Sequence, residues 1–179
     1  GVSYILEIDR EGREYVRIEL KDFGGAHNSF REIRKTPQGT YLVCQQRGGG
    51  KAMEIDANGK TIRTFPGGRF VATRLPDGNT LIACGDEHRV IEVDPEGEVV
   101  WSIGQNDLEG VSLGFASGLQ RLPNGNTLIT NWGGHGGAAG AAILEITRDK
   151  KVVWRSPHSI ANRVSNLYVL DLPADQIWR

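Results

Sequence analysis

Leu122–Ile129 has the sequence LPNGNTLI, and nearly the same eight residues, LPDGNTLI, occur at Leu75–Ile82. A more divergent copy, TPQGTYLV, lies at Thr36–Val43. When a sequence repeats with a period of several tens of residues, each repeat is one structural unit that packs against its neighbours. The fold is therefore best predicted from one repeat and from the way the repeats follow one another.

A second signature follows each copy of the first, and its three examples are AMEIDANGKTIRTF (Ala52–Phe65), VIEVDPEGEVVW (Val90–Trp101) and ILEITRDKKVVW (Ile143–Trp154). A further example, ILEIDREGREYV (Ile5–Val16), has no copy of the first signature in front of it. Each complete repeat thus contains four runs of β-branched and apolar residues, bounded by turns rich in Pro, Asp, Asn and Gly. Such runs are typical of short β-strands.

The repeat length identifies the architecture. Pro37 and Pro76 are 39 residues apart, and Pro76 and Pro123 are 47 residues apart. Four strands in 40–45 residues are typical of a propeller blade, whereas a solenoid repeat of this length normally contains helices. No window of the sequence has a helical period. The sequence predicts one all-β domain, a β-propeller of four-stranded blades.

The predicted boundaries leave a part of a blade at each end of the chain. In order they are a half-blade at 1–22, complete blades at 27–66, 69–104 and 115–156, and a closing strand at 160–179. The two terminal parts could join and close a four-bladed ring. Alternatively, the chain is the C-terminal part of a six- or seven-bladed propeller, whose earlier blades are missing from this sequence or are supplied by another chain or by a homo-oligomer. We favour the second interpretation, because four-bladed rings are uncommon.

The loops predict which face of the propeller carries function. Because strands alternate in direction, the tight repeated turns lie on one face, and the long, divergent loops lie on the other. Recognition loops diverge, whereas scaffold turns repeat. All four histidines fall in the divergent loops, and so does the unusual stretch NWGGHGG at 131–137. The candidate ligand-binding residues on this face are His27, Arg31, Asn131, Trp132, His135 and His158.

Other repeated side chains are predicted to be structural. Trp101 and Trp154 occupy equivalent fourth-strand positions and should pack between blades. Arg74 and Arg121 recur just before Leu75 and Leu122, and Arg34 lies near the matching position. The two cysteines, Cys44 and Cys84, should be small buried apolar side chains and not a disulfide.

Several function classes lack support in the sequence. The formal net charge is −1 and the pI is about 6.5, which gives no general attraction for nucleic acid. No apolar run approaches the length of a membrane-spanning helix. We find no metal-binding spacing such as HxxxH or CxxC, no nucleophile elbow and no nucleotide fingerprint, so we assign no metal, cofactor or catalytic residue.

The repeats resemble those of quinoprotein-like and arylsulfotransferase-like β-propellers. They are more similar to a group of bacterial extracytoplasmic propellers of unassigned function. The stretches that carry this resemblance are GLQRLPNGNT (118–127), NWGGHG (131–136), EITRDKKVVW (145–154) and YVLD (168–171). The resemblance implies a periplasmic or secreted protein, a natural C-terminus near Arg179 and N-terminal blades that precede this sequence.

Two functional hypotheses follow. The first is a non-catalytic module that binds a small molecule, a glycan or a protein through the divergent-loop face. The alternative is an enzyme of the sulfotransferase, quinoprotein or lactonase-like kind, with a site at the channel mouth that includes His27, His135 or His158. Propellers host both kinds of function, so the fold does not choose between them.

Overall fold

A computed structural model describes residues 2–20, 30–46, 50–68, 70–133, 141–157 and 163–171. Within these ranges the chain forms fourteen strands and no helix. The strands make three four-stranded antiparallel sheets and one two-stranded sheet, which we call the first, second and third blades and the N-terminal hairpin. The protein is therefore all-β with propeller-like blades, as the repeats predict.

Each blade is built from strands that are consecutive in sequence. The N-terminal hairpin contains β1 (Ser3–Ile8) and β2 (Glu14–Leu20), and the first blade contains β3 (Glu32–Lys35), β4 (Tyr41–Gln45), β5 (Lys51–Ile55) and β6 (Thr61–Thr64). The second blade contains β7 (Val71–Arg74), β8 (Thr80–Ala83), β9 (Val90–Val93) and β10 (Val99–Ile103). The third blade contains β11 (Ala116–Arg121), β12 (Thr127–Asn131), β13 (Ile143–Ile146) and β14 (Val152–Arg155).

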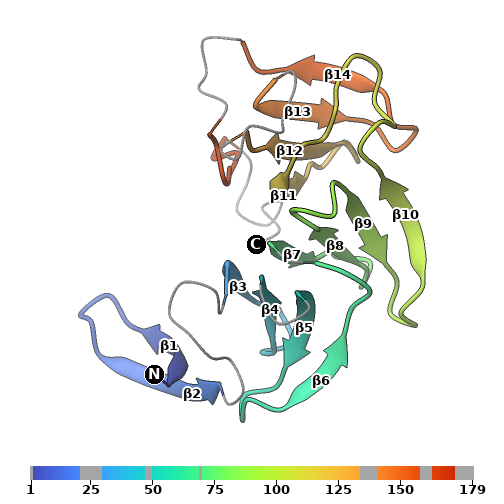
Figure 1. Ribbon diagram of the computed structural model, residues 1–179. Helices are drawn as coiled ribbons and strands as arrows, with labels where there is room; N and C mark the ends of the chain where they lie inside the picture. The colour runs from blue at the N-terminus through green and yellow to red at the C-terminus, as the bar shows by residue number, and fades with distance from the viewer. Residues whose placement is uncertain are drawn as a thin grey trace.

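The blades follow one another along an arc. The innermost strands β3, β7 and β11 lie toward its centre, and β6, β10 and β14 lie at the periphery (Figure 1). The N-terminal hairpin and the third blade lie at opposite ends of the arc and are separated by a gap (Figure 1). The described strands therefore do not form the closed four-bladed ring.

The repeated LPxGN motif forms the turn between the first two strands of a blade. In the second blade, the amide of Gly78 donates to the carbonyl of Leu75 at 3.0 Å, and the amide of Leu75 donates to the carbonyl of Asn79 at 2.8 Å. Gly78 has φ +90°, a conformation that side chains with a Cβ rarely adopt. Gly125 takes the same place in the third blade with φ +84°. The turn chemistry explains why this motif recurs nearly unchanged.

The apolar core lies between neighbouring blades. One cluster joins the N-terminal hairpin to the first blade, a second joins the first and second blades, and a third joins the second and third blades. Cys44 and Cys84 belong to the second cluster, where both are buried and free. Burial raises the pKa of both thiols, that of Cys84 to about 12, so both remain neutral apolar side chains. This confirms the prediction for the cysteines.

The C-terminal segment 163–171 differs from the prediction, because its residues form no strand. Its backbone hydrogen bonds are made to side chains: the amide of Val169 donates to Oε1 of Gln120 at 2.8 Å, and the amide of Leu167 donates to Oδ1 of Asn166 at 2.9 Å. Side chains therefore replace the strand ladder expected in the closing strand. The rest of the closing strand, at 160–162 and 172–179, lies outside the described residues.

The two equivalent tryptophans, Trp101 and Trp154, were both predicted to pack between blades, but they lie in different environments. Trp101 lies between the second and third blades, where its indole NH donates to the carbonyl of Arg148 at 2.7 Å. Trp154 remains 45% exposed, and among the described strands no further blade follows the third one to pack on it. In the described part of the chain there is no helix with the length and hydropathy needed to span a bilayer.

Candidate ligand site at the centre of the arc

A cavity of about 410 Å³ lies where the innermost strands begin, on the face of the divergent loops. This volume is typical of pockets that enclose small molecules. Its walls come from all three blades and from the C-terminal segment. The lining residues are Arg31, Glu32, Gln46, Phe70, Phe115, Trp132, Arg163, Ser165 and Asn166.

Aromatic rings form one wall of the cavity. Phe70 directly precedes β7, Phe115 directly precedes β11, and Trp132 directly follows β12, so the ends of three strands position the three rings. The ring centroids of Phe70 and Phe115 are 5.3 Å apart with perpendicular planes, and those of Phe115 and Trp132 are 5.2 Å apart at 69°. Such edge-to-face contacts fix the rings in a continuous apolar surface.

Guanidinium groups lie at the edge of this aromatic wall. The guanidinium carbon of Arg31 lies 5.8 Å from the centroid of Phe70, and Nε of Arg31 donates to Oε1 of Gln46. Arg163 enters the lining from the C-terminal segment. Among the described residues, no carboxylate forms an ion pair with Arg31 or Arg163. Within the described ranges, the cavity edge therefore carries two arginines that form no ion pair.

The acidic residue of the cavity, Glu32, already has partners. Its Oε1 accepts from Nε of Arg34 at 2.6 Å and from the hydroxyl of Tyr168 at 3.1 Å, and its Oε2 accepts from Nδ2 of Asn166 at 3.0 Å. Burial raises the pKa of Tyr168, so its hydroxyl stays protonated and can donate at neutral pH. Glu32 thus ties the C-terminal segment to β3.

The same segment is fixed to β11 on the other side of the cavity. Oγ of Ser117 donates to the carbonyl of Val164 at 3.4 Å, and Gln120 accepts from the amide of Val169. Gly118 allows the segment to pack closely against β11, because a Cβ at position 118 would lie 2.7 Å from Cα of Asn166. Segment 163–171 therefore runs from β3 to β11 and forms a wall of the cavity.

The structure brings together two of the six predicted site residues. Arg31 and Trp132 line the cavity. Asn131 is 1% exposed: its Oδ1 accepts from the amides of Gly114 and Phe115 at 2.8 and 3.3 Å, and its Nδ2 donates to the carbonyl of Ser112 at 2.9 Å. Asn131 thus positions Phe115 and is not available to a ligand. The other three predicted residues, His27, His135 and His158, lie outside the described residues.

Phe70 and Phe115 are not among the site residues that the sequence predicts. Both lie at the junction of a divergent loop and a first strand. A signal was present, because Phe30, Phe70 and Phe115 each stand just before a first strand. Within the described ranges, no three His, Cys, Asp or Glu side chains are grouped as metal ligands would be.

Comparison with known proteins shows the family. Residues 10–132, more than half of the sequence, match the family described as Mal s 1 allergenic protein-like. The chain belongs to the Mal s 1 allergenic protein-like family. The matching family is thus not one of the quinoprotein or arylsulfotransferase repeat families that the sequence resembles. No functionally curated protein matches this Mal s 1-like chain.

Solved structures support the bacterial propeller-like fold. A protein of unknown function from Bacteroides caccae superimposes with a TM-score of 0.81 and 32% identity, over 92% of this chain and 63% of its own. Catalytically inactive virginiamycin B lyase from Staphylococcus aureus, crystallised with quinupristin, has a TM-score of 0.60 and 14% identity, over 89% of this chain and 50% of its own. The Mal s 1-like chain thus spans less than two thirds of either protein.

A putative exported protein from Bacteroides fragilis is also similar, with a TM-score of 0.54 and 8% identity. The similarity covers 93% of this chain and 46% of the exported protein. At such identities the lyase and the exported protein show a shared fold alone.

Proposed function

We propose that this chain is a non-catalytic binding module, and that the central cavity holds a small organic anion with a flat apolar part. One observation carries the proposal: Phe70, Phe115 and Trp132 form an apolar wall beside the guanidinium groups of Arg31 and Arg163. Aromatic rings stack on flat apolar groups. Guanidinium groups bind carboxylates and phosphates through paired hydrogen bonds.

The shape of the site favours a small molecule over a protein or a long glycan. The cavity has walls from three blades and from segment 163–171, so a ligand would be enclosed on several sides. Protein interfaces are larger and flatter, and bury on the order of 800 Å² of each partner. The other candidate ligands are a glycan or a protein bound at the divergent loops. The following experiment distinguishes them from a small anion in the cavity.

The test uses 2-naphthoate as a probe, with 2-naphthamide as its uncharged match. We expect the naphthoate to bind the full chain with a Kd of about 1 mM or below, measured by NMR titration or calorimetry. Arg31→Gln should weaken binding about fivefold, because a charged hydrogen bond is lost. Trp132→Ala should weaken both probes, because the apolar wall is lost.

The control is Arg10→Gln, which changes an exposed arginine in the turn of the N-terminal hairpin and should leave binding unchanged. Equal affinities for naphthoate and naphthamide would contradict the anion part of the proposal. Absence of binding by either probe, with the fold intact, would contradict the site itself.

The alternative, an enzyme of the sulfotransferase, quinoprotein or lactonase-like kind, is favoured by chain connectivity. His135 is three residues beyond Trp132, which lines the cavity, and three residues span at most about 10 Å. His158 is five residues before Arg163, another lining residue. If the protein has turnover, replacing His27, His135 or His158 with Ala should abolish it, whereas turnover that survives the change at all three histidines excludes this assignment.

We further propose that the chain is part of a six- or seven-bladed propeller. The described residues form three blades and a hairpin, and the chain spans 63% and 50% of two longer proteins of similar fold. Scaling by these shares gives totals of about six and about seven blades, which is within the usual range of propellers. Light scattering of any longer natural form, together with its sequence repeats, tests this number.

A further inference from the structure

An acidic side chain on the third strand of a blade, or on β1 of the N-terminal hairpin, pairs with a basic side chain on the first strand of the next blade. The basic residue always stands two positions before the proline of the LPxGN-type turn. The pairs are Glu7–Lys35 at 2.6 Å, Glu54–Arg74 at 2.5 Å and Glu92–Arg121 at 2.6 Å. Three successive junctions therefore use the same register, and Lys35 is the residue that matches Arg74 and Arg121.

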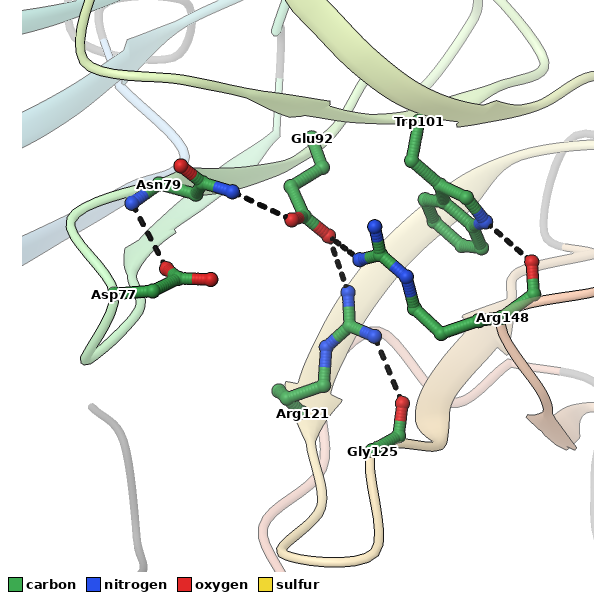
Figure 2. A network of polar contacts seen from close by, with 7 residues as sticks. All are labelled: Asp77, Asn79, Glu92, Trp101, Arg121, Gly125 and Arg148. Atoms are coloured by element: carbon green, nitrogen blue, oxygen red, sulfur yellow. Dashed lines mark hydrogen bonds and ion pairs between the residues drawn. The ribbon is translucent and has the colours of Figure 1, made fainter.

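The junction between the second and third blades shows the full arrangement (Figure 2). Oε2 of Glu92 accepts from Nη2 of Arg121 at 2.6 Å and also from Nη1 of Arg148, while its Oε1 accepts from Nδ2 of Asn79 at 2.8 Å. Both guanidinium carbons lie 5.6 Å from the ring centre of Trp101. Glu92, Asn79 and Trp101 thus form an acceptor site on one blade for two arginines of the next.

The third blade has the same acceptor site on its outward face. Glu145 matches Glu92, Asn126 matches Asn79 and Trp154 matches Trp101. Oε1 of Glu145 accepts from Nδ2 of Asn126 at 2.7 Å, as Glu92 does from its asparagine. The two acceptor sites differ in their basic partners. Glu92 pairs with two arginines, whereas in the described part of the chain no basic side chain pairs with Glu145.

An open cavity of about 580 Å³ lies beside this acceptor site. Its lining is mostly apolar, and it includes the turn between β11 and β12. The matching turn of the second blade lines the cavity between the second and third blades. The lining residues are Leu122, Pro123, Asn124, Leu128, Glu145, Trp154 and Val169. The matching cavity of about 360 Å³ between the second and third blades includes Leu75, Pro76, Glu92 and the arginines Arg121 and Arg148.

We propose that the outward face of the third blade docks a further propeller blade, whose arginine or lysine two positions before a turn proline pairs with Glu145. A second basic residue, in the register of Arg148, would pack on Trp154. Charge complementarity and the repeated register carry this proposal, and it does not depend on which ligand the central cavity binds. The Bacteroides caccae protein, of which this chain covers 63%, is long enough to hold further blades.

A second copy of the described chain does not fit this face. Its three basic side chains in the required register, Lys35, Arg74 and Arg121, are already paired within the chain. The occupant therefore has to bring a first strand whose basic residue is unpaired before docking.

The experiment uses the full chain and a labelled cyclic peptide of sequence 117–131, which copies the β11–β12 hairpin and contains Arg121. Isolated hairpins are marginally stable, so the peptide is cyclised and its cross-strand pairing is checked by NMR. We expect saturable binding, measured by fluorescence anisotropy. Arg121→Gln in the peptide and Glu145→Gln in the chain should each weaken binding about tenfold, and the two changes together should weaken it no further.

Glu98→Gln, at an exposed carboxylate of the second blade, is the matched control and should leave binding unchanged. Additive effects of the two changes, or no binding to the wild-type chain, would overturn the proposal. A second measurement is the solution mass of the chain alone, determined by light scattering. A concentration-dependent dimer that disappears in the Glu145→Gln variant would assign the face to a second copy and would also overturn the proposal.

Discussion

At the scale of single residues, Glu92 and Glu145 are the same side chain in two different electrostatic settings. The carboxylate of Glu92 is 1% exposed and faces two guanidinium groups, whereas that of Glu145 has only amide partners among the described residues. Burial lowers the pKa of Arg121, and the charge of Glu92 opposes this effect. The pair therefore stabilises the junction only while both members are present.

This difference predicts the effects of two identical substitutions. Glu92→Gln should destabilise the protein by about 3 kcal/mol, because it leaves Arg121 buried without its counter-charge. Glu145→Gln should change the free energy of unfolding by less than about 0.5 kcal/mol, because Glu145 forms no ion pair within the described residues. Urea unfolding of both variants measures the two values. Equal losses would mean that the ion pair contributes nothing beyond the hydrogen bond to the neighbouring asparagine.

At the scale of structural elements, segment 163–171 depends on the absence of a side chain at Gly118. A Cβ there would lie 2.7 and 2.8 Å from Cα and Oδ1 of Asn166, distances that force one of the two elements to move. The segment is held by a few hydrogen bonds and forms no strand, so it will move before the β11–β12 ladder does.

Gly118→Ala should therefore release the segment and leave the third blade folded. We expect hydrogen exchange at the amide of Val169 to accelerate about tenfold, with little change at the amides of β12. Gly104→Ala is the matched control, because the three atoms nearest to its Cβ would belong to Asp107, at 3.7 to 3.9 Å. Unchanged exchange at Val169 in the Gly118→Ala variant would show that the segment is not seated on this glycine.

The elements also show how far the sequence could predict this molecule. The strands and tight turns were predictable, because alternating apolar residues and glycines at positive φ are local signals. The site residues were predicted only in part. Arg31 and Trp132 line the cavity, but Asn131 is bonded to the loop before β11 through Ser112 and Gly114. Phe70, Phe115 and segment 163–171 meet there because of the curvature of the arc, which no local pattern encodes. The segment escaped prediction because side chains satisfy its backbone.

At the scale of the whole molecule, Glu7 joins the N-terminal hairpin to the first blade. It accepts hydrogen bonds from Lys35 at 2.6 Å, from the hydroxyl of Tyr41 and from the hydroxyl of Tyr15 at 2.9 Å. Bonding to Lys35 first, and then to Tyr41, lowers the pKa of Glu7 from 4.5 to about 2. The folded state therefore keeps this carboxylate ionised at pH values where the unfolded chain has protonated it.

The sign of the pH dependence follows from this shift. The stabilisation by Glu7 is complete above about pH 4.5, declines as the pH falls and is lost near pH 2. Glu7→Gln should lower Tm at pH 7, and the difference from wild type should shrink steadily between these two pH values. Thermal unfolding from pH 2 to 7 measures it, with the exposed Glu98→Gln as control. A difference that is constant over this range would contradict the shifted pKa.

The shared junction register has a consequence for the gene. The stretches 75–82 and 122–129 differ at one of eight residues, so a crossover between their coding segments would preserve the turn motif. A crossover between them would delete or duplicate 47 residues, the distance from Pro76 to Pro123. Each new boundary would again place a glutamate on one side and an arginine on the other. Duplication or deletion of one repeat would therefore change the number of blades without requiring a new contact surface between neighbouring blades.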